Sequence, residues 1–516
     1  MSRPSTGPAG PLPTSIILAL AACYVLIRIV FWFSAEAGGD EAYYWVWGQR
    51  FELSYYDHPG MLAWVQGMFT SVFGQSIFVL RLPNLLTTGV VFYTFYLITR
   101  RLYPGRSRIQ FLLVSFALAA SPMLFTFMAQ AIMDHIMMAL LLVSAYLVIF
   151  YLDDVTAGRP TSVWRLYVGA ALLGLAGITK YNSVFLGVGI GLTVLLHPRL
   201  RPLLKQPHIY FAGLLALVML LPVLFWNIEN DFASFRYHLV DRTPAKAGLQ
   251  FHFNMLSGFI VGTILVLSPF TIWLAVRRFF FEPGARPLAW FRIGNHSIYA
   301  SVALITFSVS TTLFLLRSGF ASTLLYWNIP AYLLVLPLLG SALVDADGNW
   351  KGKKLFIGQQ VYGILLAAIV AFNYAILPLD TWSRRGRGDQ GSRHWYGWKD
   401  TAAAIHEEIA KSGKQPILFT TDHHVAGALS FTMNRTDIVA VSARRDQYDI
   451  WWDDSRYGGR DGLIIFDEWG TKRETALSLF RRVGPVREIQ IRKYGYPIKI
   501  MYLQPVYEYQ GNKDRG

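Results

Sequence analysis

Two short motifs near the start of the chain carry side chains that can do acid–base or metal chemistry. The first is Gly38-Gly39-Asp40-Glu41-Ala42-Tyr43-Tyr44-Trp45, and the second is Tyr55-Tyr56-Asp57-His58-Pro59. A carboxylate is a suitable general base for a hydroxyl nucleophile, and carboxylates with a histidine are common ligands of divalent cations. The two motifs therefore predict a catalytic base, a metal, or a cationic or phosphorylated ligand at this position.

The composition around these motifs is that of a membrane protein. Of the 516 residues, 53% are hydrophobic and only 15% are charged, and the mean hydropathy is +0.36. Apolar runs of about 18 or more residues recur up to residue 377, and each is long enough to cross a bilayer as a helix. This pattern excludes an ordinary soluble enzyme and predicts a polytopic α-helical protein.

The apolar runs predict about eleven transmembrane helices. Lys180 splits one long apolar run into two of these predicted spans. The predicted spans are 14–34, 77–99, 109–128, 133–152, 164–179, 181–197, 208–226, 254–276, 297–316, 324–344 and 355–377.

Basic loops give these spans an orientation. Positive charge concentrates in the loops 100–108, 197–205, 277–292 and 351–354, and the positive-inside rule places such loops in the cytoplasm. The net charge of +15 is therefore explained mainly by topology, and we expect no nucleic-acid partner. The opposite, outer face then receives the loop 35–76 and everything after residue 378.

The polar tail reads as a separate small domain. We expect a transmembrane domain over 1–377, a linker over 378–395 rich in Arg and Gly, and an α/β domain over 396–516. Hydrophobic periodicity and turn residues predict the elements of this domain. They are a helix at 400–411, strands at 416–420 and 462–466, a helix at 472–482, and closing strands at 487–492 and 498–503.

The topology gathers further charged residues on the outer face. Asp134 begins the fourth span, Lys180 and Tyr181 stand at the break between two spans, and Arg242 follows the span that ends near 226. Charged groups at membrane depth usually mark a substrate path or a relay. Acids and bases on one side only favour a catalytic site at the interface over a conduction path.

Each of these residues also has a structural interpretation. Asp40 and Glu41 could cap the N-terminus of a helix, because acids are favourable there. The same interpretation applies to Asp134. Asp57 could stabilise a turn, Lys180 could reach the interface by snorkelling, and Arg242 could pair with lipid phosphates. Both interpretations remain open for each residue taken alone.

Several motifs together carry a family resemblance. Besides the two opening motifs, they are Gly174-Leu175-Ala176 through Thr179-Lys180-Tyr181, Trp226-Asn227 through Ser234-Phe235, and Gln447-Tyr448-Asp449-Ile450-Trp451. With these motifs the chain resembles bacterial members of the dolichyl-phosphate-mannose–protein mannosyltransferase superfamily, which have the GT-C fold. The resemblance includes aminoarabinose transferases of lipid A and rhizobial galacturonosyltransferases of lipid A or lipopolysaccharide core. Two positions depart from it: Pro59-Gly60 replaces Pro-Pro, and Asp57-His58 stands where the aminoarabinose enzymes have Glu-Lys.

The resemblance implies an integral inner-membrane glycosyltransferase with a periplasmic active site and a periplasmic C-terminal α/β domain. Its donor would be a polyprenyl-phosphate sugar, and its acceptor would be lipid A, lipopolysaccharide core or another envelope glycan. Galacturonic acid is one candidate sugar. The reaction would be a single displacement with inversion.

The resemblance also implies roles for particular side chains. Asp40 would be the base, with Glu41 and Asp134 in support. Lys180, Arg242, His58 and Tyr181 would bind the donor phosphate. Asp57 would be the ligand of a divalent cation.

Other functions are compatible with a membrane protein of this composition. They are a transporter or flippase of lipid-linked sugars, a protein O-mannosyltransferase, and a non-catalytic assembly protein. A secondary transporter is expected to show inverted repeats with broken helices near the bilayer midplane, and the sequence has no evident internal repeat. Donor sugar, acceptor, metal dependence and oligomeric state stay open.

Overall fold

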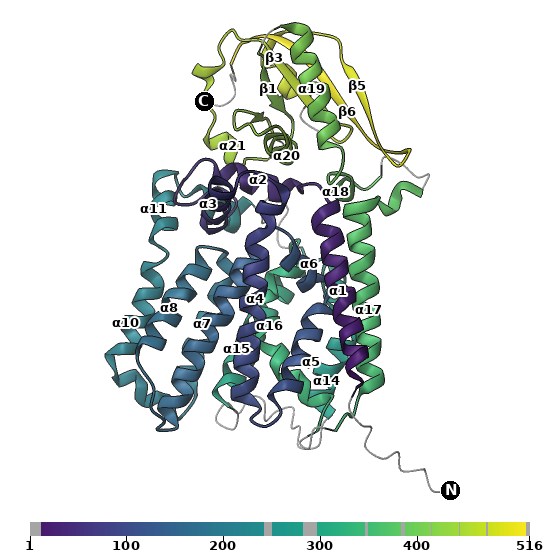
Figure 1. Cartoon of the computed structure of the whole chain (residues 1–516). Helices are drawn as coiled ribbons and strands as arrows, with labels where there is room; N and C mark the ends of the chain where they lie inside the picture. Colours follow the sequence, from purple (N-terminus) through teal and green to yellow (C-terminus); the bar gives the residue numbers. More distant parts are fainter. Residues whose placement is uncertain are drawn as a thin grey trace. The chain divides into compact units, whose positions relative to one another are not determined.

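The chain divides into two compact units in the computed structural model (Figure 1). Unit 1 comprises Met1–Leu26 and Asn84–Ala367, and unit 2 comprises Ile27–Pro83 and Ala368–Gly516. The described residues are 12–241, 250–281, 297–345, 349–382, 388–413, 415–442, 444–470 and 473–511.

Long apolar helices account for most of the chain up to residue 376. Among the described residues, six are long and apolar enough to span a membrane, and nine if each bent pair is one span. The six are α1 (Thr14–Ser34), α4 (Ile77–Leu102), α7 (Met133–Thr156), α15 (Ile298–Ser318), Leu325–Ala342 with α16 (Ile329–Leu339) at its centre, and Lys353–Ile376, which includes α17 (Lys353–Ala371). The predicted multi-pass helical architecture is confirmed, while the count of eleven spans stays a prediction.

Three of the predicted spans are bent at a proline. α5 (Ser107–Ala119) and α6 (Pro122–Ala129) meet at 81°, α10 (Pro207–Val218) and α11 (Leu221–Glu229) at 41°, and α13 (Phe253–Leu267) and α14 (Pro269–Val276) at 97°. Each second helix has a proline at its first or second position, where the missing N–H is tolerated but the preceding helix cannot continue. Hydropathy averages over such a break and therefore predicts one straight span.

The break expected at Lys180 is present. α8 (Trp164–Gly177) ends just before it, the short η1 (Tyr181–Ser183) follows, and α9 (Val184–Leu196) continues the chain. α7 is largely buried and packs on α8 through Gly169, where a Cβ atom would lie 2.5 Å from Val148. Asp134 lies in the first turn of α7, and Lys180 lies in the break that follows α8.

The remaining described elements of unit 1 are short. They are η2 (Arg201–Lys205), α12 (Ala233–Arg236), η3 (Tyr237–Asp241), η5 (Arg277–Phe281), η8 (Leu325–Asn328) and η9 (Gly340–Ala342).

A mixed sheet forms the core of the C-terminal part of unit 2. Its strand order is β2-β1-β3-β6-β4, and β5 also pairs with β6. β1 runs parallel to β2 and β3, while β6 runs antiparallel to β3, β4 and β5. The strands are β1 (Ile417–Thr420), β2 (Val439–Ala440), β3 (Gly462–Asp467), β4 (Phe480–Val483), β5 (Arg487–Lys493) and β6 (Tyr496–Tyr509).

Most predicted elements of this domain are present, with one correction. The helix expected over 472–482 is wrong in its second half, because α22 (Arg473–Leu477) is followed by strand β4. Phe480 pairs with Tyr509 of β6 and is buried in the sheet's core, so tertiary pairing overrides the local helical pattern. The other helices are η10 (Phe372–Ile376), η11 (Leu379–Trp382), α18 (Gln390–Arg393), α19 (Trp398–Ser412), α20 (His423–Met433), α21 (Gln447–Ile450) and η12 (Asp454–Arg456).

Two helices from the N-terminal region complete unit 2. α2 (Gly39–Gly48) packs on α3 (Met61–Phe73) through Gly48 and Gly67, where a Cβ on Gly67 would lie 2.3 Å from the Gly48 carbonyl oxygen. α2 also packs on α20 at Gly427, where a Cβ would lie 2.7 Å from the backbone nitrogen of Tyr43. The backbones approach closely because these positions lack side chains, and this brings the first acidic motif against the C-terminal sheet domain.

Candidate active site

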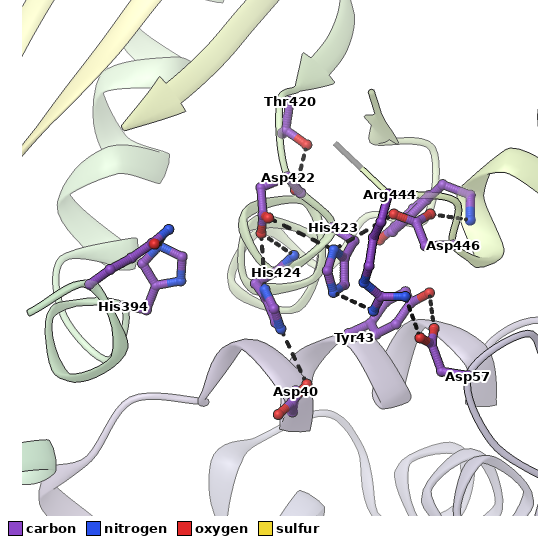
Figure 2. A network of polar contacts seen from close by, with 12 residues as sticks. Asp40, Tyr43, Asp57, His394, Thr420, Asp422, His423, His424, Arg444 and Asp446 are labelled. Carbon is purple, nitrogen blue, oxygen red and sulfur yellow. Dashed lines mark hydrogen bonds and ion pairs between the residues drawn. The ribbon is translucent and has the colours of Figure 1, made fainter. Parts of the chain in front are cut away.

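Asp40 is the accessible acid of the first motif. It lies in the first turn of α2, and its side chain is 59% exposed. Its Oδ1 atom is 3.3 Å from Nε2 of His424, and its other oxygen has no hydrogen-bond partner among the described residues (Figure 2). One carboxylate oxygen is therefore held and the other is open to an incoming group.

His424 connects Asp40 to the N-terminus of α20. Its Nδ1 lies 3.0 Å from Oδ1 of Asp422, and its backbone N–H donates to the same oxygen at 2.8 Å. Burial alone would lower the pKa of His424, but hydrogen bonds to Asp40 and Asp422 outweigh it and raise the pKa to about 10. The protein around Asp40 excludes part of the bulk water and so opposes its ionisation, yet the hydrogen bond and charge of His424 hold the pKa of Asp40 below its usual value.

Asp57 lies at the other side of the same network, and each of its two oxygens accepts a hydrogen bond. Arg444 donates to its Oδ1 at 2.6 Å, and the Tyr43 hydroxyl donates to its Oδ2 at 3.0 Å. A second nitrogen of Arg444 lies 3.1 Å from Nε2 of His423. Asp57 thus joins the second motif to α2 and to the loop that carries Arg444 (Figure 2).

Glu41 is next to Asp40 in sequence but is buried. Its carboxylate makes a two-point ion pair with Arg81, at 3.0 and 2.7 Å, and both side chains are at most 1% exposed. It also accepts a hydrogen bond from the Gly38 N–H at 3.0 Å, as an acid at a helix N-terminus does. The helix-capping interpretation is therefore correct for Glu41, and its supporting role in catalysis stays a prediction.

Asp134 and Lys180 form a buried ion pair in unit 1. The Lys180 ammonium donates to both oxygens of Asp134, at 2.6 and 2.7 Å, and both side chains are buried. The ammonium also lies 4.4 Å from the centre of the Tyr326 ring. The structure brings these two predicted site residues together.

The remaining predicted site residues have separate surroundings. The Tyr181 hydroxyl lies 3.0 Å from Oγ of Ser234. The His58 ring lies 6.1 Å from that of Tyr44, and its carbonyl accepts from the Tyr55 N–H. Arg242 lies outside the described residues. Asp40, Glu41, Asp57 and His58 belong to unit 2, whereas Asp134, Lys180 and Tyr181 belong to unit 1, so the predicted residues form two sets.

The C-terminal domain contributes residues that the sequence motifs did not predict. They are Asp422, His423, His424, Arg444 and Asp446. A signal was available, because Thr421-Asp422-His423-His424 directly follows the predicted strand 416–420, and strand ends are common places for functional side chains.

These missed residues include a set that fits a divalent cation. Asp422, His423 and His424 each offer a ligand atom, and the three atoms lie within 4.8 Å of one another. His423 Nδ1 lies 3.6 Å from Oδ2 of Asp446, both residues are buried, and neither atom has a hydrogen-bond partner among the described residues. Imidazole nitrogens with carboxylate oxygens are the donor set of zinc and related ions.

Comparison with known proteins agrees with this fold and sequence. Residues 57–226 match the family model described as dolichyl-phosphate-mannose-protein mannosyltransferase. The matched region comprises 170 of the 516 residues of the chain. Two curated relatives come from Rhizobium johnstonii. The chain is 27% identical to the lipid A galacturonosyltransferase RgtD over 208 residues, 38% of this chain and 40% of RgtD. It is 24% identical to the lipopolysaccharide core galacturonosyltransferase RgtB over 367 residues, 70% of this chain and 71% of RgtB.

Solved structures show the same fold over nearly the whole chain. ArnT from Cupriavidus metallidurans bound to undecaprenyl phosphate superposes with a TM-score of 0.61 at 15% identity, covering 95% of this chain and 98% of ArnT. ArnT in the apo state gives a TM-score of 0.56 at 14% identity, with the same coverage. The predicted family resemblance is confirmed, and the family and relatives indicate a multi-pass membrane glycosyltransferase.

Proposed function

We propose that the protein transfers a sugar from a polyprenyl-phosphate donor to a cell-envelope acceptor at the periplasmic face of the inner membrane, with inversion. The relatives that act on lipid A and lipopolysaccharide core support such an acceptor and favour galacturonic acid as the sugar. The structural neighbour bound to undecaprenyl phosphate supports a lipid-phosphate donor.

The observation that carries this proposal is the contrast among the three acids of the two opening motifs. Glu41 and Asp57 are buried, and both oxygens of each are engaged by Arg81 or by Arg444 and Tyr43. Asp40 keeps an open oxygen on an exposed side chain. Of the three, Asp40 is the acid that can take a proton from an acceptor hydroxyl.

The chemistry is a single displacement. Asp40 accepts the acceptor's hydroxyl proton as the oxygen attacks the anomeric carbon, and the bond from that carbon to the phosphate oxygen breaks. The electron pair leaves with the lipid phosphate, which is already a good leaving group, so positioning and charge neutralisation supply much of the remaining rate. His424 holds the second Asp40 oxygen and fixes the direction of the open one.

Lys180 and Arg242 are proposed to neutralise the departing phosphate, with His58 and Tyr181 contributing hydrogen bonds. Lys180 already binds the two oxygens of Asp134, in a buried, charge-assisted contact. A donor phosphate would share or replace that carboxylate, which presents the same anionic oxygens.

The Asp40→Asn variant tests the proposal. The amide keeps the size of the side chain and cannot accept the proton, so transfer should fall by about a hundred- to ten-thousand-fold. Transfer is measured with purified protein in proteoliposomes, a polyprenyl-phosphate sugar and lipid A, by mass spectrometry of the acceptor. Glu407→Gln, at an exposed acid paired with Lys411, is the control and should retain activity. Wild-type transfer by Asp40→Asn would overturn the assignment.

Two other functions have distinct outcomes in this assay. Movement of donor lipid across the bilayer without sugar transfer would indicate a flippase. The matching family is described as a protein mannosyltransferase, which makes a protein the second candidate acceptor. The assay therefore includes a protein substrate beside lipid A. Transfer to the protein alone would indicate a protein O-glycosyltransferase.

We further propose that the expected divalent cation binds at Asp422, His423 and His424, with Asp446 as a fourth ligand. Zinc ligands lie about 2.0–2.2 Å from the ion. The ligand atoms of Asp422, His423 and His424 lie within 4.8 Å of one another, so small side-chain shifts would bring them to that distance from a shared ion. A bound cation there would add positive charge close to Asp40. Elemental analysis of purified protein should find about one equivalent, lost in His423→Ala and kept in His394→Ala. Equal metal content in the wild type and in His423→Ala would exclude the site.

A further inference from the structure

A pocket in unit 2 has no place in the proposed reaction. Its volume is about 250 Å³, slightly below the range of about 300–1,000 Å³ typical of small-molecule sites. Its lining includes four arginines and a single acid: Arg50, Arg435, Arg456, Arg460 and Asp437. The formal charge of these five groups is +3, four positive charges and one negative, which favours the binding of an anion there.

Two of the arginines are engaged in building the pocket. Arg435 makes a two-point ion pair with Asp437, at 2.9 and 2.7 Å. Arg50 donates to the Thr436 carbonyl at 2.5 Å and lies over the Trp451 ring, 4.6 Å from its centre. These contacts use the one acid of the lining and fix the wall.

The other two arginines keep donors for a ligand. Arg456 uses Nε to contact Asp453 at 3.0 Å, and its side chain is 68% exposed. Arg460 is exposed, and its hydrogen bond is a long one, 3.5 Å to the Arg456 carbonyl, with no carboxylate partner among the described residues. Guanidinium groups present paired N–H donors that match phosphate or carboxylate oxygens.

Aromatic side chains form the rest of the wall. Trp451, Trp452 and Tyr457 line the pocket and are partly exposed. The Trp452 indole N–H donates to Asp454 at 2.7 Å, and the rings of Trp452 and Tyr457 pack edge to face with centres 5.5 Å apart. These contacts orient the flat apolar faces, against which a sugar ring can stack.

The pocket and Asp40 lie at opposite ends of one rigid element. Asp40 is in the first turn of α2, and Arg50 follows the last turn. Ten residues of α-helix rise by about 15 Å, so a ligand that reaches both places must be longer than one sugar ring. Tyr448 also lines the pocket, and its ring stacks on that of Tyr43 in α2, with ring centres 5.7 Å apart. This contact joins α2 to the wall of the pocket.

We propose that this pocket binds an anionic saccharide of the acceptor, with Arg456 and Arg460 on its phosphate or carboxylate and the aromatic rings on its sugar face. The proposal rests on the proposed glycosyltransferase function and adds the acceptor's chemical class to it. Anchoring the acceptor there would present a more distant hydroxyl to Asp40.

Calorimetric binding to the full-length protein in nanodiscs tests this proposal. The probes are a glucosamine disaccharide with two phosphates, trigalacturonate, neutral galactotriose and inorganic phosphate. We expect one of the two anionic saccharides to bind, and which one binds identifies the anionic group. Galactotriose or phosphate binding as tightly as the anionic saccharides, or no binding at all, would overturn the proposal.

Matched variants locate the binding. Arg456→Gln/Arg460→Gln should weaken it at least about tenfold, because charge-assisted hydrogen bonds are lost. Arg481→Gln, an exposed arginine paired with Glu508 outside the pocket, should bind like the wild type. Unchanged affinity in the double variant would exclude the pocket.

Kinetics separate this proposal from the proposed function. The double variant should raise the acceptor KM at unchanged donor KM. Asp40→Asn should bind the saccharide normally while failing to transfer, so loss of binding and loss of chemistry are read independently.

Discussion

Asp40 and Asp134 have similar local settings and opposite surroundings. Each lies in the first turn of a helix, and each contacts a basic side chain from a distant part of the chain. Asp40 is 59% exposed and has one contact of 3.3 Å to a histidine. Asp134 is 1% exposed and has two contacts, of 2.6 and 2.7 Å, to a lysine.

The difference separates an acid that can exchange a proton from one that holds a charge in place. Losing one partner of a buried ion pair leaves an uncompensated charge, so such a pair mainly governs stability. An exposed carboxylate with one free oxygen adds little to stability and is available for chemistry. The same sequence pattern, an acid at a helix start, therefore serves two purposes.

The largest effect on stability should come from opening the buried pair. Asp134→Asn leaves the Lys180 ammonium buried without its counter-charge and should cost about 3–5 kcal/mol of folding free energy. Tryptophan fluorescence during heating in detergent measures the resulting fall in Tm.

The double variant Asp134→Asn/Lys180→Met sharpens the comparison. It removes both charges and should recover much of the stability. The transfer activity of the double variant then distinguishes a phosphate-binding role of Lys180 from a structural one. If Lys180 binds the donor phosphate, the double variant should be stable but inactive. Full activity in the double variant would confine the pair to a structural role.

A smaller effect is expected at His424, which holds one oxygen of Asp40. His424→Ala should lower kcat about tenfold, or about 1.4 kcal/mol, at little change in KM, because the base loses its orientation. His424→Gln keeps an N–H donor and should retain most of the rate. His394→Gln alters a neighbouring histidine paired with Asp467 instead of Asp40, and should leave transfer unchanged. Equal rates for His424→Ala and wild type would show that the Asp40 carboxylate does not depend on His424 for its orientation.

The smallest effect concerns a second buried lysine, in unit 2. Lys499 is 1% exposed, its ammonium lies 3.6 Å from the centre of the Trp398 ring, and it has no hydrogen-bond partner among the described residues. Burial lowers its pKa to about 8. In contrast to Lys180, it lacks a carboxylate contact within ion-pair distance.

The consequence for stability depends on pH. Between about pH 8 and the unfolded pKa near 10.4, the unfolded state binds more protons than the folded state, so stability rises with pH across this window. Below pH 8 the full cost of burying the charge is present. Lys499→Met should therefore raise stability at pH 7 and flatten the rise, as measured by Tm against pH. Lys411→Met, at an exposed lysine paired with Glu407, is the control and should change little. A fall in Tm for Lys499→Met would mean that its contact with Trp398 outweighs the burial cost.

Sequence reasoning worked best where one physical variable dominates. Hydropathy located the helices around Asp134 and Lys180, and alternation with turn residues located strands such as β1 and β3. It failed where tertiary contacts decide, as at Phe480, whose pairing with Tyr509 turns a helical pattern into a strand. Prolines such as Pro122 and Pro269 marked the bends, but hydropathy windows average over them.

The sequence by itself determined the membrane class, the helical segments, the family resemblance and the acids that could act. It did so because hydrophobicity, charge and motif are properties of neighbouring residues. Only the tertiary structure decided which acid is accessible, because burial and pairing depend on residues far along the chain. Arg81 pairs with Glu41, and Arg444 pairs with Asp57. His424, 384 positions from Asp40, contacts one oxygen of that carboxylate and leaves the other accessible.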